Sequence, residues 1–208
     1  MIIPLTVYVE IISYYLLPFQ WIKQPICDPP TCSRILLVAD PQILGSQESG
    51  PSILTFVARW DSDRYIRKTF LQAVNYMEPD FIIFLGDIMD AGHVASDEEF
   101  YFDLERLWRI FKLPEFLKNS RIITLPGDND IGGDDDIMIP QIVNRFYRVF
   151  NQSEGPVLAD NLQFYKVNSL TYVFQKPEYV SNDDGIIRIA LSHIPLLPRV
   201  GPFIDTVS

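Results

Sequence analysis

The sequence predicts an α/β fold built on a mostly parallel sheet that is flanked by helices. Three short apolar runs, Ile35–Ala39, Phe81–Leu85 and Ile122–Leu125, have the length of buried strands rather than of helices. Segments with helical periodicity lie between them, which gives the order strand, helix, strand, helix, strand. Parallel strands need such crossover connections. With 208 residues, of which 48% are hydrophobic, the chain can form one domain with a sizeable core.

Two crossover helices are expected between these strands. The first is predicted over Arg64–Met77, where apolar residues recur with helical spacing. The second is predicted to begin at Ser96, because Ser96-Asp-Glu-Glu99 has the spacing of a capping box, and to end near Pro114. Its buried face is expected to comprise Phe100, Leu104, Leu107, Trp108 and Phe111.

Further elements are expected in the second half of the chain. A third helix is predicted over Pro140–Phe150. Leu162–Val167 and Thr171–Phe174 then have the pattern of a β-hairpin, and Ile186–Ser192 has that of a further apolar strand. His193 follows this last strand directly.

Polar side chains follow each apolar strand at the same end. Asp40, Asp87 and Asp128 follow the first three strands, and His193 follows the fourth. Carboxyl ends of parallel strands share one edge of a sheet, where open α/β sheets bind their ligands, so we expect these side chains to converge. Such a set of carboxylates with one imidazole suits a divalent cation. The alternative is that Gly-Asp after a strand only forms a turn.

Other polar residues are interpreted as non-functional. The acidic run after Asp128 lacks the bidentate Glu of a calcium loop, because Ile139 occupies that position. His93 is interpreted as an exposed loop residue. Ser192 has no partner base in the sequence pattern that would make it a nucleophile.

Charge and cysteine content restrict the class of partner. The net charge of −10 excludes a nucleic-acid backbone as the main partner, since phosphate binding needs a basic face. The two cysteines, Cys27 and Cys32, are too few to complete a zinc site with other Cys or His pairs. A local disulfide and two free thiols both remain open.

The N-terminal segment Met1–Ile22 is strongly apolar and is long enough to cross a bilayer, which takes about 20 residues. Glu10 near its middle would be costly there. We expect a membrane anchor, with a helix lying on the soluble domain as the alternative. Residues 23–33 form the linker. Asn151-Gln152-Ser153 matches the glycosylation sequon, which bears on function only if this part of the chain is luminal.

The polar motifs, taken in order, resemble those of the calcineurin-like metallophosphoesterases. The family has Asp-x-His, Gly-Asp-x-x-Asp, Gly-Asn-His-Asp/Glu and a lone His, and this chain has Asp40-Pro-Gln42, Gly86-Asp-Ile-Met-Asp90, Gly127-Asp-Asn-Asp130 and Ser192-His193. The resemblance implies the αββα sandwich of that family. The Asp-Pro-Gln form and the apolar N-terminus are most similar to the fungal cell-division-control branch, which acts on ethanolamine phosphate of glycosylphosphatidylinositol (GPI) glycans in the secretory pathway.

The resemblance implies a role for each metal ligand. Asp40 and Gln42 would bind the first ion, Asp87 would bridge both ions, and Asp128 and His193 would bind the second. Two cations roughly 3.5–4 Å apart can hold the attacking and leaving oxygens of a phosphoryl transfer. The implied cofactor is a pair of divalent ions, with Mn²⁺ expected and Mg²⁺, Zn²⁺ or Fe²⁺ as alternatives.

Two more residues are implied to assist catalysis. Asp90 would orient a ligand or a water from outside the metal shell. Asn129 stands where the family has a His that assists the leaving group, and an amide cannot act as an acid. The chain also departs from the family pattern at Gln42, in place of His, and at Asp128, in place of Asn.

A family motif near the C-terminus is also missing. The family continues with Gly-His-x-His, whereas the only histidines here are His93 and His193. We therefore expect residues 34–208 to be a C-terminally truncated domain with weakened metal affinity.

The expected function is hydrolysis of a phosphodiester on a GPI glycan by a dinuclear metal centre. The enzyme is expected in the endoplasmic reticulum membrane, with its domain in the lumen. A cytosolic phosphoesterase acting on a nucleotide or a phosphoprotein is one alternative. The other is a non-catalytic remnant that keeps the fold and binds a metal or a partner.

Overall fold

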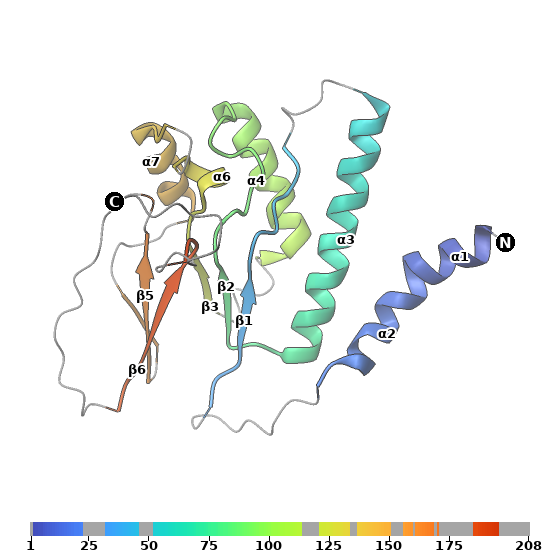
Figure 1. Ribbon diagram of the computed structural model, residues 1–208, viewed down its shortest axis with the longest axis horizontal. Coiled ribbons are helices and arrows are strands. Elements are labelled where there is room, and N and C mark those ends of the chain that lie inside the picture. Colours follow the sequence, from blue (N-terminus) through green and yellow to red (C-terminus); the bar gives the residue numbers. More distant parts are fainter. Residues whose placement is uncertain are drawn as a thin grey trace, which may run out of the picture.

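The computed structural model describes residues 2–22, 32–45, 52–113, 121–133, 137–150, 156–159, 161–168, 170 and 185–195. Its first sheet consists of β1 (Ile35–Val38), β2 (Phe81–Phe84) and β3 (Arg121–Thr124), which are parallel in the order β1-β2-β3 (Figure 1). This confirms the predicted parallel sheet and the α/β class. The carboxyl ends of all three strands point to the same edge, as expected.

Helix α3 (Ile53–Met77) connects β1 to β2 and is longer than predicted. It begins at Ile53 rather than at Arg64 because the side chain of Ser52 caps it by accepting a hydrogen bond from the backbone N–H of Thr55 (3.2 Å). The first turns of α3 leave several apolar side chains exposed, so they do not follow the buried-stripe pattern on which the prediction relied.

Helix α4 (Asp97–Phe111) connects β2 to β3 and confirms the predicted capping box of Ser96 and Glu99. The prediction of its buried face is wrong at one residue, because Trp108 is 45% exposed. Ile110 is buried instead and belongs to the core on the helix side of the first sheet. The segment 114–120, which contains the expected end signal Pro114, lies outside the described residues.

A second sheet contains β4 (Val157–Ala159), β5 (Leu162–Val167) and β6 (Ile187–Ser192). Strand β5 pairs antiparallel with β4 and parallel with β6. The strand before His193 therefore exists as predicted, but it does not extend the first sheet. The predicted hairpin partner of β5, Thr171–Phe174, lies outside the described residues, and in the described part β5 forms its hairpin with β4.

The two faces of β2 belong to two hydrophobic cores. Ile82 and Phe84 pack with the helices, whereas Phe81 and Ile83 pack with the second sheet. This alternation follows from the two-residue period of a strand. The described residues thus form a layer of helices, a first sheet and a second sheet, which are the first three layers of the predicted αββα order (Figure 1).

Two more helices lie near the carboxyl edge of the first sheet. Helix α7 (Pro140–Phe150) has the predicted bounds. The short helix α6 (Asp128–Ile131) was not predicted, and it begins directly after Gly127. Its first residue is one of the predicted metal ligands, so the backbone of α6 fixes where that carboxylate lies.

The N-terminal segment forms α1 (Ile2–Val7), the π-helix η1 (Tyr8–Ile12) and α2 (Ser13–Gln20). It lies beside α3, where the ring of Tyr14 is 6.2 Å from that of Tyr65 and the ring of Trp21 is 5.0 Å from that of Tyr76 (Figure 1). Within the described part of the chain, no helix combines the length and the apolar character that crossing a membrane requires.

Of the two cysteines, only Cys32 lies within the described residues. Cys32 is disulfide-bonded, as one of the two interpretations predicts, and Cys27 lies outside the described residues. The sequon at Asn151 and the acidic residues 134–136 also lie outside them.

Candidate metal centre

The loops that follow β1 and β2 adopt a backbone conformation that is unusual for their residue types. Asp40 (φ 48°), Gln42 (φ 38°) and Asp87 (φ 50°) all have left-handed backbone angles. The other described non-glycine residues with positive φ, Glu78 and Lys112, are helix C-caps, where this conformation is common. Strained non-glycine residues cluster at functional sites, and here they coincide with three predicted metal ligands.

The carboxylate of Asp87 is the point where three loops meet. It accepts hydrogen bonds from the side-chain amides of Gln42 (3.1 Å) and Asn129 (3.0 Å) and from the backbone N–H of Asn129 (3.1 Å). The loop after β1 also pairs with it through the backbone, since Gln42 N–H donates to the carbonyl of Asp87 (3.0 Å). Asp87 is buried, so these contacts fix its orientation.

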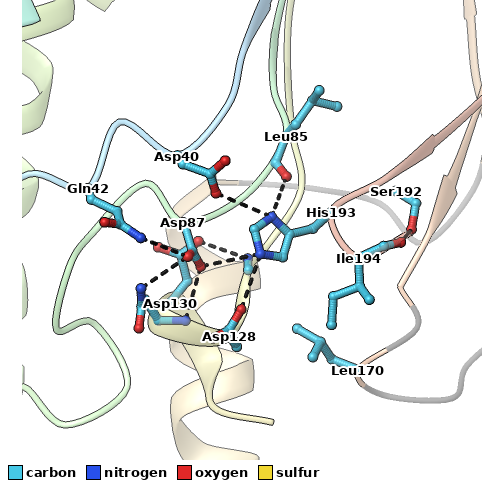
Figure 2. A network of polar contacts seen from close by, with 12 residues as sticks. Asp40, Gln42, Leu85, Asp87, Asp128, Asp130, Leu170, Ser192, His193 and Ile194 are labelled. Carbon is cyan, nitrogen blue, oxygen red and sulfur yellow. Dashed lines mark hydrogen bonds and ion pairs between the residues drawn. The ribbon is translucent and has the colours of Figure 1, made fainter. Parts of the chain in front are cut away.

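His193 enters the same volume from the second sheet (Figure 2). Its Nδ1 lies 2.9 Å from the carbonyl oxygen of Leu85, and because a carbonyl can only accept, Nδ1 carries the hydrogen. Its Nε2 then faces Oδ1 of Asp128 at 3.1 Å and Oδ1 of Asp87 at 3.6 Å. Histidines that bind metals usually donate their other ring N–H to a carbonyl or carboxylate in this way.

The charge balance of this group fits a bound cation. Burial alone would lower the pKa of His193, but Asp87, the Leu85 carbonyl, Asp128 and Asp40 together raise it above its ordinary value. Among the described residues, His193 is the only side chain that forms an ion pair with any of these three carboxylates. Three carboxylates against one imidazole leave negative charge that a divalent ion would compensate.

The structure brings the predicted ligands together to different degrees. One ligand atom from each of Asp40, Asp87 and His193 lies within 4.8 Å of the other two, and Asp128 joins them through His193. The resemblance placed Asp40 and His193 on different ions, whereas the structure has them in one group. Gln42 contacts Asp87 through its amide nitrogen, while the predicted role requires the amide oxygen. The assignment of individual ligands to two ions stays a prediction.

The two predicted catalytic residues lie in different settings. Asn129 contacts Asp87 directly, as described above. Asp90 is joined to the site loop through its backbone N–H, which donates to the carbonyl of Ile43 (3.2 Å). Its role in orienting a ligand or a water stays a prediction. His93 is half-buried rather than exposed, and its backbone and ring both bond to the carbonyl of Asn129, so it supports the loop that carries Asn129.

Sequence reasoning missed Asp130, which holds the two site loops together. Its side chain is buried, at 1% exposure, and accepts hydrogen bonds from the backbone N–H groups of Ile88 (3.1 Å), Met89 (2.9 Å) and Gly127 (2.9 Å). Burial raises the pKa of Asp130 to about 7, although these three donors act in the opposite direction. The only signal for it in the sequence is the acidic residue that ends the motif Gly127-Asp-Asn-Asp130.

The glycines of the two motifs are required by close contacts. A Cβ on Gly86 would lie 2.6 Å from Nδ1 of His193, and one on Gly127 would overlap the Asp87 carboxylate. Gly86 also has φ +104°, which side chains rarely adopt. The Gly-Asp pairs therefore permit the close approach of loops that assembles the site.

Fold and site together define a class of protein: an α/β domain with a carboxylate-rich group that could hold a divalent cation at the carboxyl end of its parallel sheet. Comparison with known families agrees. The chain belongs to the calcineurin-like phosphoesterase family, whose model matches residues 33–205, and this places it among the hydrolases that act on phosphoesters.

Comparison with individual proteins gives more distant relatives. The chain is 28% identical over 177 residues to "Cell division control protein 1" of Saccharomyces cerevisiae, which covers 78% of this chain and 35% of that protein. It is 28% identical over 167 residues to "Metallophosphoesterase 1" of Danio rerio, covering 79% and 42%, respectively. It is 27% identical over 149 residues to the Drosophila melanogaster "Metallophosphoesterase 1 homolog", covering 71% and 37%. The matches thus span less than half of these curated relatives.

Proposed function

We propose that this chain forms the catalytic core of a dinuclear phosphodiesterase that hydrolyses ethanolamine phosphate on GPI glycans in the endoplasmic reticulum, with its domain in the lumen and its N-terminal segment at the membrane. The observation that carries the phosphoesterase part is the position of Asp87. One of its carboxylate oxygens lies 3.6 Å from Nε2 of His193, which also contacts Asp128 (3.1 Å), and one ligand atom each from Asp40, Asp87 and His193 lies within 4.8 Å of the other two. A carboxylate in this position would be able to bridge two ions held roughly 3.5–4 Å apart, the spacing that dinuclear phosphoryl transfer uses.

The residues fit a pair of divalent ions, for which we propose Mn²⁺. When bound, the ions would supply charge stabilisation to the transferring phosphoryl group. Asp40, Asp87, Asp128 and His193 would hold them. The hydrogen bond from Nδ1 of His193 to Leu85 keeps Nε2 directed at the carboxylates, and Asn129 restrains the orientation of Asp87.

The choice of substrate rests on similarity to the cell-division-control branch. The similarity to "Cell division control protein 1" supports it, together with the Asp-Pro-Gln form of the first motif. Because the matches cover less than half of those relatives, the substrate and the membrane location are proposals for this chain rather than properties of it.

Turnover of a generic diester tests the chemistry. The purified chain, supplied with Mn²⁺, should hydrolyse bis(p-nitrophenyl) phosphate, and Asp87→Asn should abolish the reaction. Glu98→Gln removes an exposed carboxylate outside the site motifs and serves as the control. Unchanged turnover in Asp87→Asn would remove this residue from the mechanism and overturn the proposal.

A second experiment tests substrate and location. Cells that lack the protein should accumulate GPI glycans heavier by one ethanolamine phosphate, as measured by mass spectrometry. Microsomal fractionation with glycosidase treatment should find the protein in membranes and glycosylated at Asn151. A soluble, unglycosylated product would instead support a cytosolic phosphoesterase.

One observation favours a second candidate, a metal-binding protein without turnover. The amides of Gln42 and Asn129 both donate to the same oxygen of Asp87, Oδ2. Any ion that used this oxygen would have to displace them, which weakens metal binding at that oxygen. Stoichiometric metal in the purified chain without hydrolysis of the diester would establish this candidate.

A further inference from the structure

A groove between α3 and α4 is lined by cationic and aromatic side chains and has a volume of ≈ 470 Å³. Its lining residues belong to α3 and α4, whereas the metal centre lies at the carboxyl ends of the strands. Figure 1 shows these two helices beside the first sheet. Five of the chain's 17 basic residues line it, although the protein as a whole carries a net charge of −10. These residues are Arg59, Arg64, Arg67, Arg106 and Arg109.

Part of this positive charge is compensated within the protein and part is not. Arg106 is buried and bonds to Asp63 (2.8 Å) and Asp103 (2.6 Å), so it is fully engaged. Arg64 pairs with Asp61 (2.8 Å).

Of the remaining arginines, Arg59 has Asp103 as an acidic neighbour, whereas Arg67 and Arg109 have no acidic partner in the described part of the chain. Arg67 is exposed and forms no ion pair there. Arg109 is exposed as well, and its Nε donates only to the carbonyl of Glu105 (3.3 Å). Arg59 donates one N–H to the carbonyl of Gly45 (3.4 Å), and its buried Nε has no partner. Guanidinium groups in such a setting are well suited to phosphate oxygens, which they can bind with two hydrogen bonds.

Apolar side chains surround these arginines. Phe56 and Trp60 line the groove, and they are 70% and 56% exposed. Ile53, Leu54 and Val57 are exposed on the same first turns of α3. Large exposed apolar patches of proteins often mark interaction sites, and five exposed apolar side chains within two turns of one helix are a candidate for such a patch. Aromatic and aliphatic residues beside arginines on a helix are typical of helices that lie in a bilayer interface.

We propose that this groove binds the phosphate headgroup of an anionic phospholipid, with the N-terminal half of α3 lying against the bilayer surface. Arg59, Arg67 and Arg109 contact the phosphate, while Phe56 and Trp60 lie among the first carbons of the acyl chains. The combination of uncompensated cations and exposed apolar groups matches the two layers of a membrane interface. A nucleic acid or an acidic peptide would leave the apolar half of the surface in water.

Flotation of the purified chain with vesicles tests this proposal. Vesicles of phosphatidylcholine with phosphatidylserine should carry the chain, and added salt should weaken the binding. Vesicles of phosphatidylcholine alone should carry much less, and this difference separates the groove from any apolar contribution of α1 and α2. Each arginine near an anionic surface changes partitioning by about fivefold, so Arg67→Gln with Arg109→Gln should reduce binding about 25-fold.

The matched control pair is Arg121→Gln with Arg148→Gln, which removes two exposed arginines outside the groove. Equal losses in both pairs would overturn the proposal, because they would reflect net charge alone. It would also be overturned if the chain bound inorganic phosphate in solution but did not float with the anionic vesicles, which would show a site for a free anion. Self-association that is lost in Trp60→Ser, without vesicle binding, would instead show an interface between two copies of the chain.

The lipid-binding proposal and the phosphoesterase proposal can be tested independently of each other. Asp87→Asn leaves the groove intact, so that variant should float like the wild type even when it has no turnover. Loss of flotation in Asp87→Asn would mean that vesicle binding occurs through the metal centre, which would also overturn the proposal.

Discussion

Nε2 of His193 lies 3.1 Å from Oδ1 of Asp128, although 65 residues separate them in the chain and the two strands that precede them belong to different sheets. The contact exists because β6 packs face to face against the first sheet through Leu191 and the apolar side chains of β2. The second sheet therefore does more than cover a core: it delivers the imidazole of the site.

Removal of His193 should abolish stabilisation by metal. Mn²⁺ at roughly 100 times its dissociation constant would stabilise the wild type by about 2.7 kcal/mol, or about 5–10 °C in melting temperature for a chain of this size. His193→Ala should lose most of this shift in a thermal unfolding assay with and without EDTA. Glu98→Gln changes an exposed residue outside the site motifs and should retain the shift. An equal shift in wild type and His193→Ala would exclude His193 as a ligand.

Asp130→Asn should destabilise the protein by about 2–4 kcal/mol, since a buried carboxylate that accepts three backbone N–H groups is replaced by an amide with one acceptor oxygen and an N–H₂ group facing donors. Urea unfolding measures this change. Glu98→Gln, at an exposed position, should change the free energy of unfolding by less than about 0.5 kcal/mol. A loss in Asp130→Asn as small as in this control would show that the loops are held by other contacts.

Gly86→Ala should be more damaging than Gly185→Ala. Both glycines have positive φ, so both substitutions introduce backbone strain of about 1–2 kcal/mol. A Cβ at Gly185 meets nothing within 4 Å, whereas one at Gly86 meets the ring of His193. Only Gly86→Ala should therefore also weaken Mn²⁺ binding, measured by calorimetry. Equal metal affinity in the two variants would contradict the close contact that the structure shows.

The buried pair of Asp103 and Arg106 should make stability depend on pH. Burial raises the pKa of Asp103 above its ordinary value of 3.8, and the hydrogen bond from Arg106 offsets this only in part. The folded state therefore binds the proton of the Asp103 carboxyl more tightly than the unfolded state does. The contribution of this protonated carboxyl to the free energy of unfolding is complete below about pH 4 and is lost as pH rises through the pKa in the folded state.

Urea unfolding of wild type and Asp103→Asn at several pH values between pH 4 and pH 7 tests this sign. The stability advantage of the wild type over the variant should be larger at pH 4 than at pH 7. An advantage that grows with pH would show that the attraction of Arg106 outweighs the cost of burying the carboxylate.

The sequence by itself determined the three parallel strands, the capping box at Ser96, helix α7 and the positions of Asp40, Asp87 and Asp128 after the carboxyl ends of the strands. These depend on local signals: apolar runs of strand length, cap spacing, and glycine before aspartate. It left three things undetermined. The exposed apolar start of α3 does not follow a buried stripe, Trp108 shares the helical spacing of buried neighbours, and Asp130 looks like any acidic loop residue.

Only the tertiary structure decided that His193 arrives from a second sheet, that Asp130 ties the Asp87 loop to the Gly127 loop, and that unpaired arginines meet exposed aromatic side chains between α3 and α4. None of these follows from periodicity, because each depends on which face of one element packs against another. Contacts between residues distant in the chain depend on which whole faces of helices and strands are buried against each other. A local sequence pattern does not specify which faces these are.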